Sequence, residues 1–113
     1  MASVFKVNST GTAGAIDASL AVPAGYVYRL VSVTVKMSAA PTTSENLTIT
    51  LDANAGSEYD TLLYSLDLSA GSTTALAWFP DEPMLLEGGD AIDVAYANTD
   101  SGTFGVQITA QMV

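Results

Sequence analysis

Hydrophobic and polar residues alternate along most of this chain. The pattern is clearest over residues 103–112, TFGVQITAQM, where every second residue is apolar and Gln107, Thr109 and Gln111 lie between the apolar ones. Apolar residues with a period of two line one face of a β-strand, whereas an amphipathic helix needs a period of about 3.6. No window of the chain has helical spacing. The pattern therefore predicts an all-β protein.

Short strands separated by clusters of Gly, Pro, Asn and Ser are typical of a β-sandwich or a β-barrel. The alternation and these clusters predict strands at residues 3–8, 15–22, 26–37, 46–52, 59–68, 74–79, 91–98 and 103–112. A chain of 113 residues is long enough for one domain around one core. We therefore predict an eight-stranded antiparallel β-sandwich in a single domain.

The long strand at residues 26–37 allows a more detailed prediction. Val31, Val33, Val35 and Met37 are expected to share the face that lies in the core. Leu30 and Val31 are adjacent apolar residues and break the alternation, which indicates a β-bulge.

The segment LLEGGDAIDVAY, residues 85–96, raises the question of whether Asp90 does chemistry or only turns the chain. Gly accepts a positive φ, and Asp hydrogen-bonds nearby backbone, so Gly-Gly-Asp suits a tight connection between strands. We predict that Asp90 is a turn residue that begins the next strand. The pattern Leu-x-x-Gly-Asp-x-Ile in this segment also resembles a turn of many jelly-roll sandwiches, so a jelly-roll-like arrangement is expected.

The N-terminal segment differs in composition from the rest. Residues 9–14, STGTAG, are typical of a flexible elbow. Residues 1–14 are therefore expected to form an arm or an edge strand, and residues 15–113 the sandwich. Strands 3–8 and 103–112 are both predicted to be sheet edges, whose unpaired backbone groups need a partner. Val4, Phe5 and Val7 are accordingly interface candidates.

Composition and charge narrow the function. The chain has no Cys and no His, which removes the commonest nucleophiles, general bases and zinc ligands. Three basic residues against twelve acidic ones give a net charge of −9, and such a surface repels nucleic acid. No apolar run is long enough to span a membrane. We predict a non-enzymatic protein with no cofactor, no nucleic-acid partner and no membrane partner.

The acidic residues do not form a recognisable metal motif. Residues 52–58 place oxygen ligands at alternate positions, as calcium loops do, but the spacing of the remaining ligands is wrong. We therefore predict no metal site. Trp78 is expected to lie in the core and Phe79 to face the opposite way, which makes Phe79 a further interface candidate. A sugar-stacking role for the two aromatic residues is the alternative.

Three longer segments resemble a known group of proteins. They are KMSAAPTTSENLTITLD, EYDTLLYSLDLSAGS and AWFPDEPMLLEGGDAIDVAYANTD, and in this order they are similar to small structural proteins of tailed bacteriophages. The resemblance rests on residues 42–47, 64–65, 78–80, 86–90 and 96–100. It implies a jelly-roll-like capsid decoration (cement) protein, commonly a homotrimer.

The implied partners are the major capsid protein or other virion subunits. The implied location is the outer capsid surface of a virion assembled in the host cytoplasm. Two alternatives stay open. The chain is a tail or fibre component of the virion, or it is a carbohydrate-binding or adhesin module.

Overall fold

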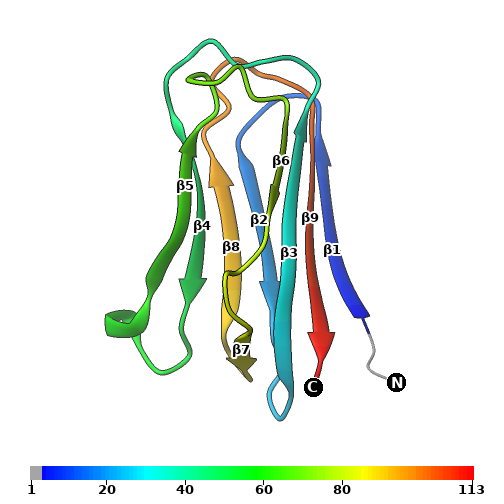
Figure 1. The fold of residues 1–113 in the computed structure, drawn as a ribbon, viewed down its shortest axis with the longest axis vertical. Coiled ribbons are helices and arrows are strands. Elements are labelled where there is room, and N and C mark those ends of the chain that lie inside the picture. Colours follow the sequence, from blue (N-terminus) through cyan, green and yellow to red (C-terminus); the bar gives the residue numbers. More distant parts are fainter. Residues whose placement is uncertain (1–3) are drawn as a thin grey trace.

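The chain folds into two antiparallel β-sheets that face each other (Figure 1). The computed structural model describes residues 4–113. The strands are β1 (Val4–Gly11), β2 (Ile16–Ala21), β3 (Val27–Met37), β4 (Asn46–Asp52), β5 (Thr61–Asp67), β6 (Ala75–Trp78), β7 (Met84–Glu87), β8 (Ala91–Tyr96) and β9 (Phe104–Met112). A short 3-10 turn, η1 (Ser57–Tyr59), precedes β5. The predicted all-β sandwich is confirmed.

The order of the strands is that of a jelly roll. One sheet, called here sheet A, has the order β1-β9-β3-β6, and β7 pairs with β3 below β6 (Figure 1). The other, sheet B, has the order β2-β8-β4-β5. Because β6 and β7 pair with different parts of the same strand, they share one place in the sheet. The described residues thus form nine strands where eight were predicted, in a five-stranded and a four-stranded sheet. With β6 and β7 counted as one position, the two strand orders are those of a jelly roll, so the jelly-roll-like arrangement is confirmed as well.

The core lies between the sheets and is built by the alternating residues. In β8 the side chains of Ile92, Val94 and Tyr96 are buried, and those between them are partly or fully exposed. Each buried aliphatic side chain of this size contributes about 1.5–3 kcal/mol to folding. The alternation in the sequence therefore identifies the strands, and the burial of its apolar residues stabilises the packing of the two sheets.

Three details differ from the sequence-based prediction. The strand β7 was not predicted, because four residues between Pro83 and Gly88 are too few to show a period. Val31 does not share the core face. It is the extra residue of the predicted bulge, whose presence the register confirms, and it is 38% exposed. The segment 103–112 is no edge, because β9 pairs with β1 on one side and β3 on the other.

Asp90 is the turn residue that the sequence predicted, and it does more than turn the chain. Its carboxylate is buried and accepts the backbone N–H of Glu87 at 2.9 Å and that of Asn54 at 2.8 Å. Its backbone C=O accepts the N–H of Val22 at 2.9 Å. Asp90 thus hydrogen-bonds to three connections at one end of the sandwich. Both of its carboxylate oxygens accept structural hydrogen bonds from backbone N–H groups.

Candidate docking surfaces

The four interface candidates from the sequence fall into two groups. Val4 and Phe79 are 57% and 60% exposed, so both side chains are free to contact another molecule. Phe5 and Val7 lie on the inward side of β1, where both are half-buried against the core. Val4–Gly11 forms an edge strand that pairs with β9 along its whole length. Trp78 is half-buried and packs against the core. Its side chain and that of Phe79 point to opposite sides of the chain.

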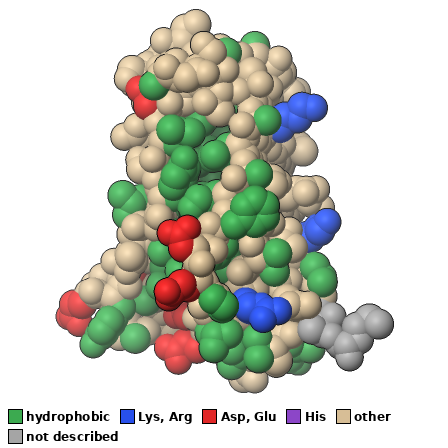
Figure 2. Space-filling view, viewed as in Figure 1, with side chains coloured by type: hydrophobic (Ala, Val, Ile, Leu, Met, Phe, Trp, Pro, Cys, Tyr) green, Lys and Arg blue, Asp and Glu red, His purple; other side chains and the backbone are tan. Residues whose placement is uncertain are grey.

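The two sheets carry opposite charge. The strands of sheet A contain all three basic residues of the chain, Lys6, Arg29 and Lys36, and one acidic residue, Glu87. The strands of sheet B contain four acidic residues and no basic one. Figure 2 shows the same separation, with Lys and Arg on the side of β3, β9 and β1 and acidic groups elsewhere. A protein with a net charge of −9 therefore has one cationic surface.

That surface, called here the cationic face, is the outer side of sheet A. Lys6, Arg29 and Lys36 each stand between inward-facing neighbours, so all three side chains point away from the core. Arg29 donates a hydrogen bond to the side-chain oxygen of Gln111 on the adjacent strand. Exposed apolar side chains share this face, namely Val4, Val27, Val31 and Leu85. The cations are thus set among apolar groups, as in many protein interfaces.

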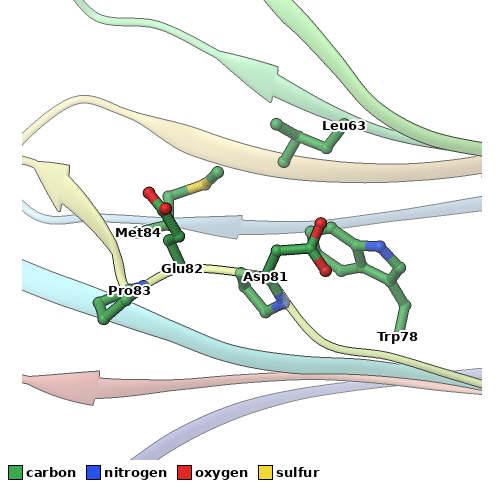
Figure 3. A pocket seen from close by; sticks show the side chains of 7 residues that line it. Leu63, Trp78, Asp81, Glu82, Pro83 and Met84 are labelled. Atoms are coloured by element: carbon green, nitrogen blue, oxygen red, sulfur yellow. The ribbon is translucent and has the colours of Figure 1, made fainter.

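A groove opens at the opposite margin of sheet A, between β5 and the segment that joins β6 to β7. This edge groove has a volume of about 490 Å³ and is lined by Leu63, Trp78, Pro80, Asp81, Glu82, Pro83 and Met84. Figure 3 shows Leu63 entering from β5, and Trp78 and Met84 from the chain on the other side. Asp81 and Glu82 place two carboxylates on an otherwise apolar lining. Leu62 and Phe79, next in sequence to lining residues, are 59% and 60% exposed.

Acidic side chains at the end of the sandwich where β8 meets the 38–45 loop are bound to backbone and hydroxyl groups. Asp100 accepts the Thr43 hydroxyl at 2.6 Å and the N–H groups of Thr43 and Thr42 at 3.0 and 2.7 Å. The Thr43 hydroxyl, followed by these N–H groups, lowers the pKa of Asp100 to about 2. Hydrogen bonds from the side chains of Ser44 and then Ser69 lower the pKa of Asp67. These carboxylates serve as loop anchors.

Tyr96 lies beneath the same loops. Its hydroxyl is buried and has no hydrogen-bond partner among the described residues. Burial, followed by the negative charges of Glu45 and Asp100, raises the pKa of Tyr96. The side chain thus stays neutral and belongs to the core, with the other inward residues of β8.

Neither a metal site nor a membrane helix is found in the part of the chain that the structure describes. Among residues 4–113, no three acidic side chains lie where they would hold a metal ion together. In the 52–58 segment, the nearby Asp60 carboxylate accepts the N–H of Ala53 at 2.8 Å and so closes the loop itself. Over the same residues, no helix is long and apolar enough to cross a membrane.

Comparison with known proteins shows the fold. No protein-family model and no curated protein matches the sequence. Among solved structures, the chain is similar to a chain in the acidic stable capsid structure of Helicobacter pylori bacteriophage KHP30. The TM-score is 0.50, the identity is 11%, and the match covers 96% of this chain and 94% of that one. The two chains therefore share one fold over nearly their whole lengths.

Proposed function

We propose that this protein is a non-enzymatic structural component of a virion, and specifically a homotrimeric capsid decoration protein on the outer shell. The observation that carries the proposal is the end-to-end likeness to a chain of a phage capsid structure. The resemblance of three sequence segments to small phage structural proteins points the same way. Jelly-roll folds serve several functions, so the fold alone does not determine what this protein does. The residues on its surface must also fit the proposed role.

The surface supports a role in protein–protein contact. Large apolar side chains on the exterior mark interaction sites when they gather together. Here Val4, Val27, Val31 and Leu85 gather on the cationic face, and Phe79 is a further exposed apolar residue between the groove residues Trp78 and Pro80. The excess of acidic residues disfavours contact with packaged nucleic acid and suits a position outside the shell.

A decoration protein of this kind acts by bridging. Each copy buries apolar side chains such as Phe79 against neighbouring subunits, and many weak contacts around one shell add up through avidity. The major capsid protein or another virion subunit is the proposed partner. The rigid sandwich keeps the contact residues at fixed spacing, since both sheets are held by a common core.

Particle binding tests this proposal. Virions of the virus that encodes the chain are stripped of it with mild denaturant, and purified protein is added back. The protein should bind saturably, and Phe79→Asp should weaken binding about tenfold or more, because it places an unpaired charge in an apolar contact. Tyr59→Asp is the matched control, since Tyr59 is equally exposed in η1. Stripped particles that bind no added protein would contradict the proposal.

The edge groove favours a carbohydrate-binding module as the second candidate function. Trp78 lines the groove beside Asp81 and Glu82, and an aromatic ring with nearby polar groups is a common sugar platform. Trp78 is the only tryptophan of the chain, so its fluorescence reports on the groove alone. If the protein binds carbohydrate in this groove, titration with soluble oligosaccharides should change the Trp78 fluorescence until the signal saturates. If the signal does not respond to a panel of host-surface glycans, the second candidate is wrong.

A further inference from the structure

We infer that the edge groove of one copy receives the cationic face of a second copy around Lys6 and Arg29, so that copies associate head to tail. The inference rests on the homo-oligomer within the proposed function and names the two surfaces that form it. Three features of the two surfaces support this contact: their opposite charges, their equal level along the strands, and their apolar side chains.

Charge restricts which surfaces of this protein can meet. Like charges held within about 4 Å repel by roughly 1 kcal/mol in water and more when partly desolvated. Eleven of the twelve acidic residues lie on sheet B, in the loops or in the edge groove, whereas the outer side of sheet A holds all three cations and a single carboxylate, Glu87. A contact between two copies that leaves out the cationic face therefore brings carboxylates together. A contact between that face and Asp81 and Glu82 pairs opposite charges.

The two surfaces lie at the same level along the strands. Lys6 is in register with Thr109 and through it with Ser32, one residue from Val33, which pairs with Trp78 of the groove. Arg29 pairs with Leu85, next to the groove residue Met84. In a ring whose axis runs along the strands, parts at one level meet in neighbouring copies. The groove and the two cations would therefore meet without tilting either copy.

Lys36 lies outside this level. It is four residues beyond Ser32 on β3, roughly 13 Å along the strand, and pairs with Ala75 at the start of β6. It faces outward like the other two cations. Lys36 thus supplies an internal control of the same charge on the same face.

Both surfaces also present apolar side chains that association would bury. Leu63, Trp78 and Met84 line the edge groove, and the exposed Val4 lies two residues from Lys6 on the same face of β1. Because the two surfaces differ, the contact is heterologous, and such contacts close into rings or continue as filaments. A closed ring agrees with the homotrimer proposed above.

Charge reversal and mixing test the inference. In Asp81→Lys/Glu82→Lys, both groove and face are basic. In Lys6→Glu/Arg29→Glu, both are acidic. Sedimentation of the purified full chain should give an oligomer for the unmodified protein and a monomer for each double variant. An equimolar mixture should again form oligomers, because each groove then meets a face of opposite charge. Recovery on mixing excludes misfolding as the cause of the loss.

Two matched variants check that position matters as well as net charge. Asp17→Lys/Asp93→Lys makes the same charge change on the outer side of sheet B and should remain oligomeric. Lys36→Glu should also raise the dissociation constant of self-association less than Lys6→Glu does. The dissociation constants of the two variants should differ at least threefold. The inference is overturned if the unmodified chain is a monomer at all concentrations, if the mixture stays monomeric, or if the sheet B variant dissociates equally. Particle binding is measured separately, so a monomer that still coats particles refutes this contact and leaves the virion role standing.

Discussion

The ring of Phe5 stacks on the ring of Tyr28, with centroids 4.7 Å apart and planes 9° from parallel. The two residues belong to β1 and β3, which are separated by β9. The rings meet across β9 where Phe5 is in register with Ala110, whose small side chain leaves room. Phe5 thus fastens the edge strand to the sheet. A substitution at Phe5 acts on stability, which makes Phe79 the better probe of an interface.

Removing the Phe5 ring is expected to destabilise the protein. Phe5→Ala should lower the free energy of unfolding by about 2 kcal/mol, less than for a fully buried Phe because the side chain of Phe5 is only partly buried. Val4→Ala, one residue away with an exposed side chain, should change it by less than about 0.5 kcal/mol. Urea unfolding of both variants measures the difference. Equal effects would mean that the stacking does not hold β1.

Gly88 is expected to tolerate no side chain. A Cβ there would lie 2.9 Å from both the Pro23 oxygen and the Ala24 Cα, which are backbone atoms that move only with the whole turn. Gly88→Ala should therefore cost about 1–3 kcal/mol. Gly105→Ala on β9 is the control, since a Cβ at that position meets nothing within 4 Å. Thermal unfolding should show a lower Tm for the first variant only.

Asp90 is expected to be a structural residue of the same end of the sandwich. Asp90→Ala leaves the N–H groups of Glu87 and Asn54 without their acceptor, which should cost about 2–4 kcal/mol. Asp93→Ala removes an equal charge from the next strand and should cost under about 1 kcal/mol. The two variants are compared by denaturant unfolding. A mild effect at Asp90 would reopen the question of a chemical role.

Acid should weaken the loop anchors before it unfolds the sheets. The pKa of Asp100 is lowered to about 2, and that of Asp67 is lowered too, so folding favours their charged forms. Their contribution is complete above about pH 4 and is lost as the pH falls towards 2. Asp100→Asn should therefore make the unfolding free energy less dependent on pH in this window.

The matched variant for the acid experiment is Thr43→Val, which keeps the Asp100 carboxylate and removes the hydroxyl that it accepts at 2.6 Å. It should reduce the pH dependence between pH 4 and pH 2 in the same direction as Asp100→Asn, but by less, because the N–H groups of Thr42 and Thr43 still donate to the carboxylate. If Asp100→Asn keeps the full slope of the unmodified protein, the hydrogen bonds from Thr42 and Thr43 do not contribute to acid stability.

Most of the fold could be predicted because each strand carries its own pattern. The strand at residues 46–52 was predicted to the residue, since Leu47, Ile49 and Leu51 alternate with Thr. The place of a strand in its sheet was harder to predict. The uncharged strand 103–112 suggested an edge in need of a partner, but a strand also lacks charge when it is paired on both sides, and β9 is such a strand.

The docking surfaces could not be predicted, because they depend on which distant segments meet. Lys6 and Arg29 are far apart in sequence, and only the register of β1, β9 and β3 puts them on one face. The edge groove needs Leu63 and Met84 to come from edge strands of different sheets. The exposure of Phe79 could be predicted from the sequence because its direction follows from that of Trp78, its neighbour, and its role as an interface residue stays a prediction.

Electron cryo-microscopy of intact virions from the virus that encodes this chain can show directly whether the protein decorates the capsid. A reconstruction should contain the nine-stranded sandwich as repeated density on the outside of the capsid shell, arranged around three-fold axes. Density of this shape confined to the tail or fibres would contradict the decoration role. A particle that contains no copy of the chain would contradict the virion role altogether.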